Sequence, residues 1–242
     1  MRLIFVRHGE PDYVKDSLTE KGIREAKLLN ERVKQWKNVT KYYVSPLGRA
    51  RLTAKLALEG TGIEPEELPW IKEFSIKVKN PLDPGTLKNV PWDFYPETWR
   101  KDEKLFDKDS WFETPLYDDV NMYEEHRKVI EPFNALLEEY GVTKKDGTYY
   151  IDHENDDTTL VFFCHLGASF ICLSELMGMS PAFMWHTFFV APTSLTIINA
   201  EERAPGILNF RIQALSDTTH LAKGGEPISQ SGYFHEIFQD SL

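Results

Sequence analysis

Three short apolar runs along the chain each end at polar residues, and a helical pattern follows each of them. Residues 3–6 (LIFV), 42–44 (YYV) and 160–163 (LVFF) have the length and composition of buried strands. Behind the first run, apolar positions recur at helical spacing over residues 19–36. This repeat of strand and helix predicts an α/β domain whose strands are parallel neighbours.

Helix boundary signals accompany these patterns. Thr19 and Ser45 are interpreted as N-caps, and the proline after Ser45 suits a first helical turn. Two further helices are expected over residues 122–140 and 168–177, each with a glycine directly behind it. The chain therefore supplies helices for both sides of a sheet.

Residues 60–123 interrupt the regular alternation. Prolines and tryptophans are frequent there, and the apolar positions show no clean period. This composition favours loops and short helices packed over the sheet rather than a separate domain. We expect one domain over residues 1–242, with a lid-type insertion at about residues 70–123.

Two hairpins are expected in the second half of the chain. Residues 148–151 and 159–163 are interpreted as strands joined by the acidic turn DHENDD, which gives a hairpin insertion at about residues 144–160. The acidic residues of such a turn are usually solvent contacts, so we expect no metal there. Residues 196–199 and 208–213 are interpreted as a second hairpin, at a sheet edge.

Charge and composition narrow the range of partners. With 28 basic and 38 acidic residues, the net charge of −10 argues against nucleic acid or an anionic membrane as a partner. No apolar run has membrane-spanning length, and the strand at Leu3 leaves no room for a signal peptide, so we expect a cytoplasmic protein.

Cys164 and Cys172 lie in apolar stretches and are expected to be buried free thiols. An anionic substrate would need a local cluster of positive charge.

Polar residues at the ends of the three strands supply such a cluster. Arg7 and His8 follow the first strand, Arg49 lies early in the helix behind the second, and His165 follows the third. Parallel strands bring these ends to one edge of the sheet, where α/β proteins bind ligands. Two guanidinium groups and two imidazoles there favour a phosphate or carboxylate site over separate solvated side chains. Arg51 is left open between an anion contact and a solvated face.

A carboxylate in the insertion is the candidate general acid. Glu73 stands among apolar neighbours, and desolvation by them would raise its pKa, as a general acid requires. The alternative interpretation is a surface glutamate. Glu10, Asp12 and Asp83 stay open as other candidates for the acid.

Four segments resemble the histidine phosphatase superfamily and its phosphoglycerate-mutase-like fold. They are RHGE at 7–10, LTEKG at 18–22, SPLGRARLTA at 45–54 and VFFCHLGASFICLSELMGM at 161–179. The segments occur in the family's order and span most of the chain. With the strand and helix pattern, the resemblance implies a three-layer αβα sandwich with a mostly parallel central sheet.

The resemblance also implies roles for the clustered residues. His8 would be the nucleophile that becomes phosphohistidine. Arg7, Arg49 and His165 would form the phosphate pocket, and Glu73 would donate the proton to the leaving oxygen. This chemistry needs no metal ion, and no other cofactor is implied.

Departures from the family pattern shape the functional expectation. Leu166 stands where the family's usual glycine follows the second histidine, and with Glu10 it is expected to complete the substrate-binding set. The insertion typical of glycolytic mutases is not found. We therefore expect a metal-independent phosphatase for a small phosphorylated metabolite. The alternatives are a mutase-type phosphotransferase and a non-catalytic module that binds a phosphorylated ligand.

The tail, residues 224–242, is a candidate cover for the site or a homodimer contact. His220 and His235 are interpreted as structural. Neither feature points to a particular substrate.

Overall fold

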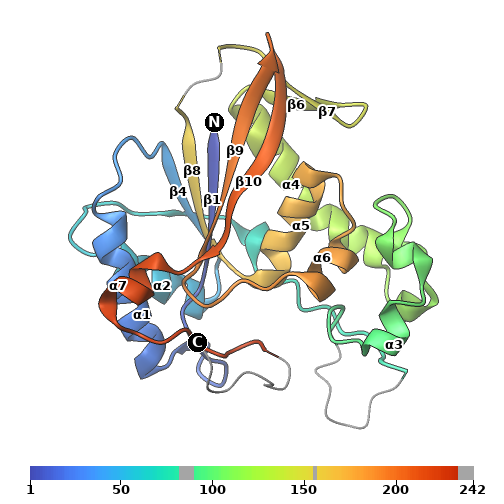
Figure 1. The fold of residues 1–242 in the computed structure, drawn as a ribbon, viewed down its shortest axis with the longest axis horizontal. Coiled ribbons are helices and arrows are strands. Elements are labelled where there is room, and N and C mark those ends of the chain that lie inside the picture. Colours follow the sequence, from blue (N-terminus) through green and yellow to red (C-terminus); the bar gives the residue numbers. More distant parts are fainter. Residues whose placement is uncertain (82–89, 155–156, 234–242) are drawn as a thin grey trace.

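The computed structural model describes residues 1–81, 90–154 and 157–233. Its centre is an eight-stranded sheet in the order β5-β4-β8-β1-β9-β10-β7-β6 (Figure 1). Four neighbouring strands are parallel, namely β1 (Arg2–Arg7), β4 (Lys41–Val44), β5 (Glu66–Glu67) and β8 (Thr159–Cys164). The other four continue the sheet by antiparallel pairing, namely β6 (Val142–Lys145), β7 (Thr148–Ile151), β9 (Leu195–Ala204) and β10 (Ile207–Asp217). Because β10 and β6 again run in the direction of β1, the sheet is mostly parallel, as predicted.

Helices cover both faces of the sheet, which gives the three layers expected from the sequence (Figure 1). One layer holds α1 (Glu20–Val33), α2 (Gly48–Ala57) and α7 (Thr219–Gly224), and the other holds α4 (Met122–Glu139), α5 (Leu166–Met177) and α6 (Pro181–Thr187). Successive side chains of β1 point to opposite faces of the sheet. Ile4 packs in the core under α1, and Phe5 packs in the core under α5. The α/β fold class is thereby confirmed.

The insertion is built from short elements that share the larger core. These are η1 (Pro69–Ile71), α3 (Pro96–Trp99), η2 (Glu103–Phe106), η3 (Trp111–Glu113) and η4 (Pro115–Tyr117). Leu105, Trp111 and Tyr117 are buried in the same cluster as Phe133 of α4 and Phe170 of α5. The insertion therefore packs as part of the α4–α6 layer.

Strand pairing corrects the first predicted hairpin. β7 pairs with β6 around Asp146 and Gly147, whose φ angles of 49° and 77° suit a tight two-residue turn. β8 lies instead between β4 and β1, and all six of its residues are buried. Burial on both faces is typical of an inner parallel strand, so the acidic turn connects two distant parts of the sheet.

The second predicted hairpin is present, but its position at a sheet edge was wrong. β9 and β10 pair with each other, while β9 also pairs with β1 and β10 also pairs with β7. Both strands are therefore interior, and β6 forms that edge of the sheet. The sequence pattern of two alternating strands does not reveal which third strand will pair with them.

Most predicted helix ends agree with the structure. Thr19 caps α1 by accepting from the Gly22 amide, and Gly178 ends α5 with φ of 64°. Ser45 is not a helix cap, because α2 begins three residues later. Cys164 and Cys172 are free and buried, as expected.

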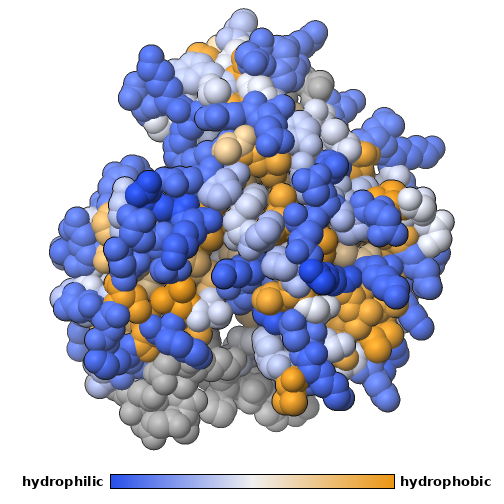
Figure 2. Space-filling model, turned by 180° about the vertical axis from the view of Figure 1, so that it is seen from behind, coloured by the Kyte–Doolittle hydropathy of each residue, from blue (hydrophilic) through white to orange (hydrophobic). Residues whose placement is uncertain are grey.

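Figure 2 shows a largely hydrophilic face, with hydrophobic side chains gathered mainly in the lower half of that view. None of the helices in the described ranges is both long enough and apolar enough to cross a membrane.

Candidate active site

The carboxyl ends of β1, β4 and β8 lie side by side and deliver the polar residues named from the sequence. The His8 amide donates to the Cys164 carbonyl, at 3.0 Å, and the Ser45 amide donates to the Phe163 carbonyl, at 2.9 Å. These bonds continue the sheet ladder beyond the strands. The residues at the three ends are therefore held on a rigid support.

Close backbone packing fixes the loop that carries His8. A Cβ at Gly9 would lie 2.8 Å from the Gly22 carbonyl oxygen, and a Cβ at Gly22 would lie 2.3 Å from the Glu10 oxygen. Only glycine permits this approach of the loop to the start of α1. The Gly9 amide also donates to Thr53 of α2, at 3.0 Å. Two helices thus hold the loop in place.

His8 is buried and its tautomer is set by a hydrogen bond. Only 1% of the residue is exposed, and its Nδ1 lies 2.8 Å from the Gly9 carbonyl oxygen. Because a carbonyl only accepts, Nδ1 carries the proton and the neutral ring keeps its lone pair on Nε2. Burial, with Arg7 and Arg49 nearby, holds the pKa of His8 well below its ordinary value. The ring is therefore held in its neutral form at physiological pH, with a lone pair on Nε2 of the kind that a nucleophile requires.

His165 lies next to His8 at the end of β8. The two ring centroids are 5.1 Å apart, and His165 Nε2 lies 2.7 Å from the Ser45 hydroxyl oxygen. Burial lowers the pKa of His165 strongly, and His8, Arg49 and Arg7 lower it further. Its Nδ1 is buried and has no hydrogen-bond partner within the described ranges. Ser45 therefore orients a second neutral imidazole at the edge of the sheet.

Two arginines flank the histidines. Arg7 donates to the carbonyl oxygens of Val190, at 2.5 Å, and Ser231, at 3.2 Å, and burial lowers its pKa. Arg49 donates to Asp16, at 2.6 Å. In the part of the chain that the structure describes, the Nε atoms of both arginines are buried without a partner. Buried guanidinium donors of this kind are suited to an anion with several oxygens.

Asp16 positions Arg49 from the loop between β2 (Pro11–Asp12) and β3 (Ser17–Leu18). One carboxylate oxygen accepts from Arg49 and the other accepts from the Gly48 amide, at 2.6 Å, at the start of α2. The pKa of Asp16 is lowered, because these hydrogen bonds outweigh its partial burial. Asp16 was not predicted from the sequence, because its partner Arg49 is 33 residues away in the chain and no local pattern links the two.

Removal of the Asp16 carboxylate is expected to misplace Arg49. For Asp16→Ala we expect kcat/KM on a phosphomonoester to fall by roughly tenfold to a hundredfold, since small misplacements of a charge-binding group are costly. Steady-state kinetics measure the loss. Asp12→Ala, in the adjoining β2, is the matched control, because the Asp12 carboxylate accepts from the Val14 and Lys15 amides and pairs with the Lys15 side chain. Equal losses in both variants would contradict the positioning role.

Glu73 lies opposite the arginines and is held by backbone amides. Its Oε1 accepts from Phe74 at 2.9 Å, Gly167 at 3.0 Å and Ala168 at 3.3 Å, the last two at the start of α5. Burial raises its pKa, against the opposing effects of Arg49, the Phe74 amide and Arg7. A carboxyl group with a raised pKa beside a cationic pocket can serve as a general acid.

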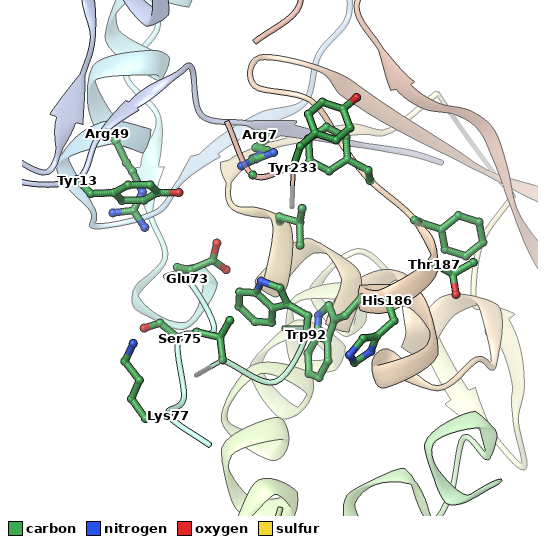
Figure 3. Close-up of a pocket in the computed structure, with 16 residues that line it drawn as sticks. Arg7, Tyr13, Arg49, Glu73, Ser75, Lys77, Trp92, His186, Thr187 and Tyr233 are labelled. Atoms are coloured by element: carbon green, nitrogen blue, oxygen red, sulfur yellow. The ribbon is translucent and has the colours of Figure 1, made fainter. Parts of the chain in front are cut away.

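A cavity of about 620 Å³ opens above these residues (Figure 3). Arg7, Arg49, Glu73 and Leu166 line it, whereas His8 and His165 are buried and are not among the lining residues. Tyr13, which the sequence analysis missed, covers Arg49 with its ring, at 5.4 Å from Cζ to the ring centroid. The structure thus brings five predicted residues, Arg7, Arg49, Glu73, His165 and His8, to one place.

Glu10 lies outside the cavity lining. Its carboxylate accepts from the hydroxyl groups of Thr19, at 2.9 Å, and Ser229, at 2.6 Å. Glu10 therefore ties the loop after β1 to the tail, and its contact with substrate stays a prediction. Asp12 is unsuited to the acid role, because Lys15 lowers its pKa. Asp83 lies outside the described residues.

The tail covers part of the cavity as far as it is described. Gly232 and Tyr233 line it, and the Ser231 carbonyl accepts from Arg7. His220 is buried with its Nε2 3.1 Å from the Thr193 hydroxyl oxygen, which fits a structural role. His235 lies outside the described residues.

The acidic segment after β7 forms no metal cluster in the described ranges. Across residues 1–81, 90–154 and 157–233, no group of three or more histidine, cysteine, aspartate or glutamate side chains could hold a metal ion. His153 instead lies 2.7 Å from the neighbouring Asp152 carboxylate.

Comparisons with solved structures show the fold. A phosphoserine phosphatase from Entamoeba histolytica, solved with phosphoserine, is 22% identical, with a TM-score of 0.58 over 91% of this chain and 98% of that one. The alpha-ribazole phosphatase from Shigella flexneri is 20% identical, with a TM-score of 0.56 over 90% and 97% of the two chains. A mycobacterial glucosyl-3-phosphoglycerate phosphatase is 17% identical, with a TM-score of 0.57 over 89% and 98%. A search of curated protein sequences finds no match.

The family model of the histidine phosphatase superfamily, branch 1, matches residues 3–213. The chain belongs to this superfamily. Among enzyme types, this assignment supports a phosphoric monoester hydrolase, as the sequence predicts.

Proposed function

We propose that the protein is a metal-independent phosphatase that hydrolyses a small phosphorylated metabolite through a phosphohistidine on His8. The observation that carries the proposal is the hydrogen bond from His8 Nδ1 to the Gly9 carbonyl, because it leaves Nε2 as the nucleophilic atom. Two buried arginines next to that ring supply the positive charge that phosphoryl transfer requires.

The first half-reaction transfers the phosphoryl group to the enzyme. His8 Nε2 attacks phosphorus while the bond from phosphorus to the ester oxygen breaks. Arg7, Arg49 and His165 donate hydrogen bonds to the phosphoryl oxygens and stabilise their charge. The protonated Glu73 gives its proton to the leaving oxygen, so the alcohol departs neutral.

The second half-reaction returns the enzyme to its starting state. Glu73, now a carboxylate, takes a proton from water, and the water oxygen attacks the phosphorus of phosphohistidine. The bond from Nε2 to phosphorus breaks, inorganic phosphate leaves, and Glu73 is again protonated. Water as the acceptor makes this a hydrolase; a second alcohol as acceptor would make it a mutase-type phosphotransferase.

Turnover of p-nitrophenyl phosphate in the presence of a chelator tests the proposal. We expect release of p-nitrophenol at a rate unaffected by the chelator, because every charge-stabilising group belongs to the protein. Loss of turnover on chelation would overturn metal independence. Lack of turnover, together with phosphate binding by calorimetry, would favour the non-catalytic module.

The dependence of rate on pH should report Glu73 and His8. Deprotonation of Glu73 removes the acid, so kcat/KM on an alkyl phosphate should fall as pH rises through its raised pKa. His8 should stay neutral to well below the ordinary histidine range of about 6.5, since burial lowers its pKa. Rates measured from about pH 4 to pH 9, corrected for substrate ionisation, test this. An alkaline limb of equal size on p-nitrophenyl phosphate would contradict the assignment of Glu73.

A cytoplasmic location is part of this proposal. The two free buried cysteines are in keeping with a reducing compartment. The homodimer contact of the tail stays a prediction.

A further inference from the structure

The cavity is much larger than a phosphoryl group requires. Its volume of about 620 Å³ falls in the range of roughly 300–1,000 Å³ that accommodates drug-sized ligands. The phosphate-binding arginines and Glu73 account for only part of its lining. Six of the remaining lining residues are apolar, namely Val90, Trp92, Leu166, Trp185, Phe188 and Phe189.

Trp92 lies directly beside the proposed acid. A Cβ built on Gly167 would lie 2.7 Å from Glu73 Oε1 and 2.8 Å from the Trp92 ring. The carboxyl group and the indole therefore contact the same point at the start of α5. Because Glu73 protonates the leaving oxygen, the alcohol portion of the substrate must lie next to this indole.

Aromatic rings line the cavity in two groups. Trp92 and Trp185 have ring centroids 5.7 Å apart, and Trp185 already donates its indole N–H to the Gly167 carbonyl, at 3.1 Å. Near Arg7, Phe189 and Tyr233 stack with centroids 4.1 Å apart (Figure 3). Such faces favour a flat ring placed offset or edge-on against them.

Polar residues occupy a different part of the lining. Ser75 and Lys77 lie on the side of Glu73 away from Tyr233 (Figure 3). A substrate with a second anionic group, such as a phosphorylated acid, would be drawn towards Lys77 instead of the aromatic wall. A phosphorylated acid would therefore bind towards Lys77, whereas a phosphomonoester with an aromatic ring would bind against the aromatic wall. Trp92, the ring next to Glu73, belongs to the aromatic wall.

We propose that the substrate is a phosphomonoester of an alcohol that carries a flat aromatic ring, with the ring bound against Trp92 and Tyr233. This inference rests on the proposed phosphatase function and narrows its substrate class. Binding energy from the ring, distant from the reacting phosphorus, would raise kcat/KM.

Three alkyl phosphates with leaving groups of similar acidity test the proposal. They are 3-phenylpropyl, 3-cyclohexylpropyl and propyl phosphate, compared with 3-phosphoglycerate and phosphoserine. We expect kcat/KM for the phenyl ester to exceed that of the propyl ester by about tenfold or more, and to exceed those of the cyclohexyl ester and of both phosphorylated acids.

Variants locate the preference on the aromatic wall. Trp92→Ala and Tyr233→Ala should each lower the ratio of kcat/KM between phenylpropyl and propyl phosphate by about fivefold. Tyr233 is 49% exposed, so its replacement keeps the test open should the Trp92 variant fold poorly. Tyr150→Ala is the matched control, since this half-exposed tyrosine of β7 is not part of the cavity lining; it should leave the ratio unchanged.

The outcomes separate this inference from the proposed function. Turnover of p-nitrophenyl phosphate combined with equal rates on the phenyl and propyl esters would overturn the aromatic substrate and leave the phosphatase standing. Faster turnover of a phosphorylated acid than of the phenyl ester would also overturn it. If the cyclohexyl ester matched the phenyl ester, the requirement for a flat ring would be overturned. Failure to hydrolyse any ester would instead overturn the phosphatase itself.

Discussion

Replacing His8 with alanine is expected to abolish turnover, with kcat falling by roughly four to six orders of magnitude, as for other catalytic nucleophiles. In the proposed mechanism the His8 imidazole supplies the atom that bonds to phosphorus. His165, the other buried imidazole of the site, has its Nε2 engaged with Ser45. Steady-state assays on p-nitrophenyl phosphate measure the loss. His153→Ala is the matched control, because that histidine is exposed, is not among the residues that line the cavity, and has its Nδ1 2.7 Å from the adjacent Asp152 carboxylate.

The same variant also tests the intermediate. Rapid quenching of the wild-type enzyme during turnover should trap phosphate on the protein through a bond stable in base and lost in acid, as expected for phosphohistidine. The His8→Ala protein should trap none. Residual turnover within tenfold of wild type, or a trapped phosphate in the variant, would assign the nucleophile to another residue.

Glu73→Gln should slow the enzyme in a manner that depends on the leaving group. On an alkyl phosphate we expect kcat/KM to fall by roughly 10²- to 10⁴-fold, the usual contribution of a general acid. On p-nitrophenyl phosphate the loss should be much smaller, because that leaving group departs without a proton. The glutamine oxygen can still accept from the amides of Phe74, Gly167 and Ala168, so the loop should keep its position.

The control for this variant is a second glutamate near the site. Glu10→Gln changes a carboxylate that is engaged by Thr19 and Ser229 outside the cavity. Its effect on rate should be the same for both substrates. Equal losses on both substrates in Glu73→Gln would remove Glu73 from the acid role.

The residues at the edge of the sheet that carries the site could be predicted, because each of them stands close in the sequence to an apolar run that forms a strand. Arg7, His8 and His165 directly follow apolar runs, and Arg49 lies in the helix that follows one. Parallel pairing then suffices to bring them together. The neighbours of Glu73 in the sequence predicted a carboxylate in an apolar setting, and the family resemblance implied its role as proton donor. Its contact with α5 depends on a partner 94 residues away.

Features that depend on distant or competing partners could not be predicted. Ser45 has the sequence signature of an N-cap, but its hydroxyl bonds His165, which is 120 residues away. Glu10 stands in the motif next to His8, yet Ser229, which is 219 residues away, engages its carboxylate. The pairing of β7 was misassigned for a related reason, since the tight turn at Asp146 and Gly147 competes with the longer acidic turn.

In the proposed mechanism, the three amides on one oxygen of Glu73 constrain the order of events at phosphorus. Because Oε1 is fully engaged by Phe74, Gly167 and Ala168, only Oε2 can carry a proton. The departing alcohol must then take its proton from Oε2, and the incoming water must give its proton to the same oxygen. Both therefore lie on the same side of the phosphorus, opposite His8. The alcohol has to leave before water can enter, and two successive inversions at phosphorus should return its original configuration.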